Sequence, residues 1–274
     1  MTATTATITW TDDDRTAVRT QNDDVHAIPA ALRSEWIKLT SLRANKVILA
    51  LTAFVSAAIA GGLAATASAS DPALPASELF IYPLPLVAML AAVAGILMFT
   101  GEAQHGTLAL ILAARPARWV LVAAKTATAA GVGCVLGVTG MAAGFAGSAL
   151  GGAELGGGSH LATRALWASL YIVLAALIGL GIGMIVRHSA AAITGLLMWS
   201  FVVESLFAPL LPESALHLLP FSAGYRLLDA GPQFEAPVVI ADMLARPAYA
   251  AIFAGYALVT LAVGTLVLYR RDSN

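Results

Sequence analysis

Six long apolar stretches separated by polar segments dominate this chain. Each is about 20 residues or longer, the length at which an α-helix crosses the hydrocarbon core of a bilayer. They cover residues 47–69, 79–99, 119–150, 163–186, 189–211 and 246–269. None alternates apolar and polar positions at the two-residue period of a barrel strand. The pattern predicts an all-α, polytopic membrane protein with six transmembrane helices, the third long enough to tilt or to extend beyond the membrane.

The composition supports this fold class. Hydrophobic residues make up 59% of the 274 positions and charged residues only 11%, against about 25% charged residues in soluble domains. So few charges cannot cover a water-facing surface, so most of the chain must face lipid or other helices. A single cysteine, Cys134, excludes a disulfide within the chain.

The basic residues predict the orientation, because Lys and Arg concentrate in cytoplasmic loops. With the N-terminus inside, 12 of the 15 basic residues are cytoplasmic, and the three outside are Arg164, Arg226 and Arg246. Both termini are therefore predicted to be cytoplasmic. We expect the protein in a bacterial cytoplasmic membrane, in contact with lipids and with no nucleic-acid partner.

Two segments precede the first span. Residues 1–27 are polar, lack the features of a signal peptide and predict a disordered cytoplasmic tail. Residues 28–46 predict an amphipathic elbow helix at the inner interface, with Leu32, Trp36 and Leu39 on one stripe. The elbow either serves as an anchor alone or also contacts a cytoplasmic partner.

The cytoplasmic loop over residues 100–118 contains the most informative pattern. Glu102 lies just below the second span, Gly106 can turn the chain, and Thr107 can cap a following short apolar helix. Such an apolar segment needs a partner or the membrane interface to cover it. An ordinary capping turn is the alternative interpretation.

Four short motifs occur in a particular order along this topology. They are Ser34-Glu35-Trp36-Ile37-Lys38-Leu39, Glu102-x-x-x-Gly106-Thr107, Arg115-Pro116-x-Arg118 and Ala124-Lys125. In this order they resemble the type-2 ATP-binding-cassette exporter permeases, most closely the small bacterial six-span members. The resemblance covers residues 28–271 and depends on the order of the motifs within the topology more than on any single one.

The resemblance implies a function and a set of site residues. In that family the loop after the second span is the coupling helix that contacts a separate ATPase subunit. The implied ATPase-contacting residues are Glu102, Gln104, His105, Gly106 and Thr107, and those of the elbow are Glu35, Trp36 and Lys38. The second and fifth spans line the path in that family, which makes Met98, Ser200, Phe201 and Glu204 candidate path residues.

The chain lacks the phosphate-binding pattern Gly-x-x-x-x-Gly-Lys-Ser/Thr. ATP and Mg²⁺ are therefore expected on a partner ATPase, present in two copies, beside a second permease that is identical or paralogous. We expect this chain to bind no cofactor or metal itself and to catalyse no reaction. The scattered histidines offer no ligand pair, and no serine nucleophile motif occurs.

Two features leave alternatives open. Glu204 is a carboxylate inside a span, where a charge is costly to bury. It is either a substrate or proton site, or it makes a hydrogen bond with a structural or gating role. We favour the structural or gating role. Residues 212–245 predict either an external cap that partly returns to the membrane or a surface hairpin. Residues 47–271 together form the predicted transmembrane domain. We predict an exporter of hydrophobic or amphipathic cargo, with an ion-gradient-driven transporter as the alternative.

Overall fold

The computed structural model describes residues 29, 31–38, 43–66, 74–106, 118–157, 160–228 and 244–271. Every regular element within these ranges is helical. The predicted tail, residues 107–117 of the predicted coupling loop and residues 229–243 of the predicted cap lie outside them. Thr107 is among those residues.

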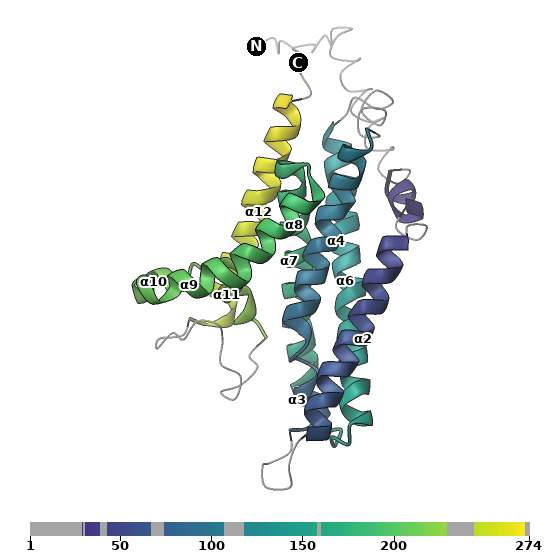
Figure 1. Cartoon of the computed structure of the whole chain (residues 1–274), viewed down its shortest axis with the longest axis vertical. Helices are drawn as coiled ribbons and strands as arrows, with labels where there is room; N and C mark the ends of the chain where they lie inside the picture. Colours follow the sequence, from purple (N-terminus) through teal and green to yellow (C-terminus); the bar gives the residue numbers. More distant parts are fainter. Residues whose placement is uncertain are drawn as a thin grey trace, which may run out of the picture.

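The helices follow one another in an up-and-down arrangement (Figure 1). A short elbow helix over residues 31–38 precedes α2. The longer elements are α2 (Arg43–Thr66), α4 (Leu84–Gln104), α6 (Arg118–Leu150), α7 (Leu161–Val186), α8 (Ser189–Met198) and α12 (Arg246–Arg271). The shorter ones are α3 (Ala76–Leu79), α9 (Glu204–Phe207), α10 (Glu213–Leu216) and α11 (Pro220–Tyr225).

Six helical segments in the described residues are long and apolar enough to cross a membrane. They are Arg43–Thr66, Ala76–Gln104, Arg118–Leu150, Leu161–Val186, Ser189–Leu210 and Arg246–Arg270. The predicted fold class is confirmed: the chain is an all-α, multi-pass membrane protein.

Two boundaries differ from the sequence prediction. Helix α4 continues to Gln104, through the first five residues of the predicted coupling loop. Helix α2 begins at Arg43, inside the predicted elbow. The prediction ended the second span at Phe99 because polar residues begin there, but an ion-paired Glu102 allows the helix to continue.

Helices α4 and α7 form the buried centre of the bundle. Their axes approach closely because glycines face the partner backbone, as expected for membrane helices that pack through small residues. A Cβ atom on Gly183 would lie 2.9 Å from the Ile96 carbonyl oxygen, and one on Gly179 would collide with the Ala92 carbonyl. The four-residue spacing of these glycines thus serves packing within the chain.

The fifth span departs from the bundle. Figure 1 shows α8 beside α7 at one end, while α9 and α10 continue away from α4. A π-helical turn over Trp199–Val203 interrupts this span, and the Glu204 N–H donates to the Trp199 carbonyl five residues back. Wide turns of this kind often occur at functional sites.

The described part of the region between the fifth and sixth spans returns to the bundle through α11. All six residues of α11 are buried. The Phe221 ring lies 6.4 Å from that of Phe253 in α12, which in turn lies 5.5 Å from that of Tyr171 in α7. Tyr256 also donates a 2.6 Å hydrogen bond to the Leu218 carbonyl. These contacts fix α11 between α7 and α12.

Candidate functional site: an ionic cluster at one end of the bundle

Four charged side chains from three separate segments meet at one end of the bundle. Lys38 Nζ in the elbow helix donates to Glu35 Oε1 at 2.9 Å and to Glu102 Oε1 at 2.8 Å. Lys125 Nζ in α6 lies 3.4 Å from Glu35 Oε2 and 2.8 Å from Glu102 Oε2. We call these four residues the ionic cluster. Each carboxylate contacts both lysines, so the four charges form a closed ring.

Local sequence explains how each member reaches the ring. Glu35 and Lys38 are three residues apart and therefore lie on one face of the elbow helix. Glu102 lies in the last turn of α4. Lys125 is seven residues, about two helical turns, into α6. The ring thus joins the elbow, the second span and the third span.

Burial makes the ring interdependent. The Lys125 side chain is 1% exposed, Glu35 6% and Glu102 14%, whereas Lys38 is 40% exposed. Lys125 also donates to the Met98 carbonyl at 3.3 Å. A buried ion pair that loses one partner leaves an uncompensated charge, which costs about 3–5 kcal/mol. Removal of any one of the two lysines or two glutamates would therefore leave an unbalanced charge in the cluster.

Lys38 is the member most open to solvent. Burial lowers its pKa, but the hydrogen bonds to Glu102 and Glu35 and the charges of both carboxylates outweigh this effect, so the pKa of Lys38 is raised above 10.5. The elbow is thus held by a lysine that stays charged throughout the physiological range.

Further contacts at the same end connect the other spans. Ser189 Oγ at the start of α8 donates to Gln104 Oε1 at 2.9 Å. Arg118 at the start of α6 donates to the Tyr269 carbonyl of α12 at 2.9 Å and stacks over its ring. The ends of α4, α6, α8 and α12 are therefore joined by side-chain contacts near the ionic cluster.

The end of α4 is a left-handed turn. The His105 N–H donates to the Gly101 carbonyl at 3.2 Å, and its Nδ1 lies 2.6 Å from the same oxygen. Gly106 then adopts a φ of +72°, the conformation in which glycine commonly ends a helix. The predicted role of Gly106 as a turning point agrees with this geometry.

The candidate path residues of the fifth span lie elsewhere, beside α11. Glu204 is 2% exposed and accepts from Phe221 N and Ser222 N, both at 2.8 Å, and from Ser222 Oγ at 2.7 Å. Its carboxylate therefore holds the first turn of α11. Ser200, Phe201 and Glu204 line one cavity of about 370 Å³, together with residues of α2, α4, α7 and α11.

The structure thus brings some predicted residues together and separates others. Glu35, Lys38 and Glu102 meet in the ionic cluster, with the Met98 carbonyl alongside rather than in the cavity next to Glu204. Trp36 is 57% exposed and belongs to a different surface.

Lys125 is the site residue that sequence reasoning missed. The motif Ala124-Lys125 contains it but assigns it no role in the site. A lysine two turns inside an apolar helix is itself a signal, because such a residue is costly to bury and usually pairs with an opposite charge or a backbone carbonyl.

The fold and the ionic cluster define a class of protein: a multi-pass α-helical membrane protein whose elbow and spans are joined at one end by buried ion pairs. No model of a known protein family matches the chain, and no curated protein does. Among the described residues, no group of three His, Cys, Asp or Glu side chains is placed to hold a metal ion.

Proposed function

We propose that this chain is the membrane-spanning permease subunit of an ATP-binding-cassette exporter of the type-2 class. It couples ATP hydrolysis by a separate subunit to the export of a hydrophobic or amphipathic compound, such as a drug, an antibiotic or a lipid. It acts in a bacterial cytoplasmic membrane with both termini in the cytoplasm. ATP and Mg²⁺ are bound by two copies of the ATPase, which lie below this chain and a second permease.

The observation that carries this proposal is the ionic cluster. A coupling element has to transmit displacement from a cytoplasmic partner to several spans at once. Glu102 lies in the last turn of α4 and is the first of the proposed ATPase-contacting residues, and its ion pairs reach both the elbow and α6. A force on the chain after Gln104 is therefore passed to three segments through charged contacts.

The cavity beside Glu204 supports the proposed class of cargo. Its walls include Leu86, Met89 and Phe201, and polar groups come from Glu204, three serines and three tyrosines. A cavity of about 370 Å³ falls within the range of roughly 300–1,000 Å³ that is typical of small-molecule sites. A wall surface that is mostly apolar but carries several hydroxyl groups and one carboxylate suits an amphipathic compound.

The alternative is an ion-gradient-driven transporter, which requires an ionisable group that exchanges ions near the membrane midplane. Glu204 would be the group to do so. Its carboxylate accepts three hydrogen bonds from the first turn of α11, which favours a positioning role. For this reason we place the ATP-driven exporter first.

Reconstitution tests the proposal. The chain is placed in proteoliposomes with and without its co-purifying ATPase, and ATP-dependent movement of a fluorescent amphipathic dye is measured together with ATP hydrolysis. We expect transport only with both subunits. Glu102→Gln should lower the dye moved per ATP hydrolysed by about fivefold or more, the range of typical coupling energies.

Glu78→Gln is the matched control, because Glu78 of α3 pairs with Arg164 at 3.6 Å at the opposite end of the second span. It should leave the coupling ratio unchanged. Dye transport by the chain alone, driven by a proton gradient and abolished by Glu204→Gln, would establish the alternative. Failure of any ATPase to bind would also refute the proposal.

A further inference from the structure

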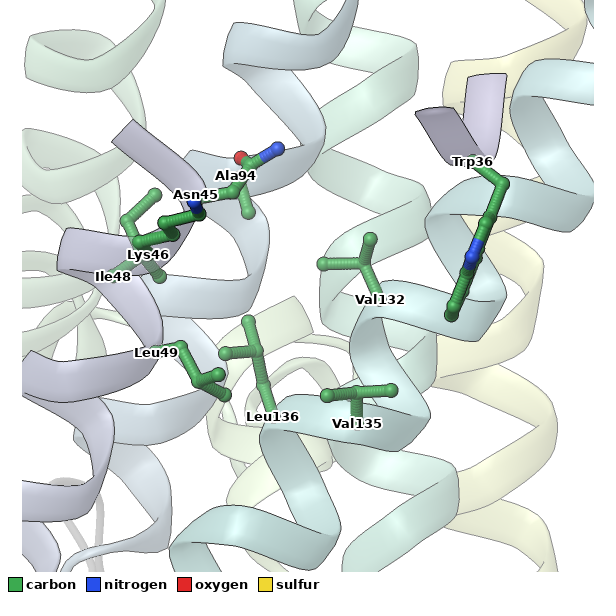
Figure 2. A pocket seen from close by; sticks show the side chains of 9 residues that line it. All are labelled: Trp36, Asn45, Lys46, Ile48, Leu49, Ala94, Val132, Val135 and Leu136. Atoms are coloured by element: carbon green, nitrogen blue, oxygen red, sulfur yellow. The ribbon is translucent and has the colours of Figure 1, made fainter. Parts of the chain in front are cut away.

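A groove lies beside the ionic cluster, between the elbow helix, α2 and α6. Figure 2 shows Trp36 on one side, residues of α2 on the other and residues of α6 between them. Its volume is about 330 Å³. The lining residues are Trp36, Asn45, Lys46, Ile48, Leu49, Ala94, Val132, Val135 and Leu136.

The groove has an apolar interior and is open at the side. Ala94 of α4 is 4% exposed and forms its floor, while Val135 is 45% exposed and Leu49 38% exposed at its rims. Of the described residues that line it, Lys46 is the only charged one. In a membrane protein, a side-facing groove between spans opens into the bilayer, so a hydrocarbon chain can fill it.

The mouth of the groove is positively charged. Lys46 lines it, and Arg43 lies one helical turn earlier on the same face of α2; both side chains are exposed. Glu35 is the only acidic residue between positions 25 and 70. Its carboxylate faces Lys38 and Lys125 in the ionic cluster instead. The charge at the mouth therefore suits an anionic group.

The depth of the mouth also fits a lipid headgroup. The mouth lies where α2 begins, beside Trp36 of the elbow. Tryptophan and basic side chains are enriched at the level of lipid headgroups. A single ligand with an apolar chain below and a negative charge above satisfies both parts of the groove.

We propose that the groove binds an anionic phospholipid from the leaflet on the elbow side. One acyl chain lies along Leu49, Val132 and Val135, and the phosphate contacts Lys46 and Arg43. This inference depends on the membrane-spanning fold and not on the proposed exporter function. The bound lipid would join the elbow, α2 and α6 next to the ionic cluster.

Native mass spectrometry of the detergent-purified full chain tests the proposal, with dioleoyl-phosphatidylglycerol and dioleoyl-phosphatidylcholine as probes. We expect tighter retention of phosphatidylglycerol. A basic residue near a membrane surface contributes a factor of about five in affinity for anionic lipid. The Arg43→Ala/Lys46→Ala variant should therefore weaken phosphatidylglycerol binding by up to about 25-fold and leave phosphatidylcholine binding nearly unchanged.

Two matched controls locate the site. Val135→Trp fills the groove and should reduce binding of both lipids, whereas Val138→Trp, one turn further along α6 and 62% exposed, should not. Arg33→Ala removes an exposed charge of the elbow that does not line the groove and should have no effect. Thermal unfolding shows whether each variant is folded, and the two exposed substitutions at Arg43 and Lys46 test the site even if Val135→Trp is unstable.

Three results would overturn the proposal. The first is equal retention of the two lipids by the unmodified chain. The second is a loss of lipid binding in Val138→Trp equal to that in Val135→Trp, or a loss in Arg33→Ala equal to that in Arg43→Ala/Lys46→Ala. The third is disulfide cross-linking of two chains through Val135→Cys in a Cys134→Ser background, which would show that a second copy of the chain covers the groove.

Discussion

Two buried carboxylate sites in the described part of this protein are stabilised in different ways. In the ionic cluster, Glu35 and Glu102 are neutralised by two lysines. One of them, Lys125, lies 90 residues from Glu35 along the chain. At Glu204, the carboxylate is stabilised by hydrogen bonds from α11, 17 and 18 residues further along the chain. The first arrangement joins several spans, whereas the second fixes one short helix to its neighbouring span.

This difference indicates what each site can do. A ring of opposite charges responds as a unit, because displacement of one member exposes the charge of the others. A carboxylate that caps a helix turn responds locally, and its loss releases that turn. We therefore expect changes in the ionic cluster to affect the whole end of the bundle and changes at Glu204 to affect α11.

The largest expected effect is that of Lys125→Met. It leaves two buried carboxylates facing only Lys38, and the free energy of unfolding should fall by about 3–5 kcal/mol. Thermal unfolding in detergent measures the loss. The double variant Lys125→Met/Glu102→Gln restores a neutral set and should recover part of it. If the double variant loses the sum of the two single losses, the ring is not an interdependent unit.

Glu204→Gln should have the next largest effect. An amide offers one acceptor oxygen where the carboxylate accepts three hydrogen bonds from α11, and hydrogen bonds to charged groups contribute about 1.5–3 kcal/mol. Hydrogen exchange at Phe221 and Ser222 should become faster, while exchange in α4 stays unchanged. Ser222→Ala removes one of the three bonds and should cause a smaller change. Unchanged exchange in Glu204→Gln would contradict the helix-fixing role.

Gly106→Ala should destabilise the end of α4 by about 1–2 kcal/mol, the cost of a left-handed conformation for a residue with a side chain. No atom of the described residues lies within 4 Å of a Cβ at this position, so the expected cost is that of the backbone conformation. Gly101→Ala is the control. Its Cβ also meets no atom, but it is helical, and alanine should stabilise it by up to about 1 kcal/mol. Equal effects of the two changes, measured by unfolding, would contradict this prediction.

The smallest expected effect is a pH dependence at Lys38. Because its pKa is raised in the folded protein, its contribution to stability is complete below pH 10.5 and is lost as the pH rises through the higher folded value. Lys38→Arg keeps the charge in that range. The stability difference between the unmodified chain and this variant should change only above pH 10.5, as measured by unfolding at stepped pH.

Much of the fold could be predicted from the sequence. Hydrophobic length alone located all six spans, since the bilayer thickness sets the length of a crossing helix. The boundary at Phe99 was placed five residues too early, because a polar run does not show that its carboxylate is paired. The hydrophobic pattern of the fifth span also gave no indication of the π-helical turn at Trp199–Val203.

The candidate site was only partly predictable. Glu35, Lys38 and Glu102 were singled out by motif order, and the spacing of Glu35 and Lys38 places them on one helix face. Nothing local connects either to Lys125, since their meeting depends on how α4 and α6 pack. Likewise, the position of Glu204 in a span predicted a buried carboxylate but not its hydrogen-bond donors.

The sequence by itself determined the number of spans, their approximate limits and the need for every buried charge to find a partner. These follow from the length of each apolar run and from the cost of burying a charge. Only the tertiary structure decided which partners are chosen, because ion pairs, caps and grooves form between segments far apart along the chain. Its packing made Lys125 a member of the ionic cluster and Trp36 a wall of the groove.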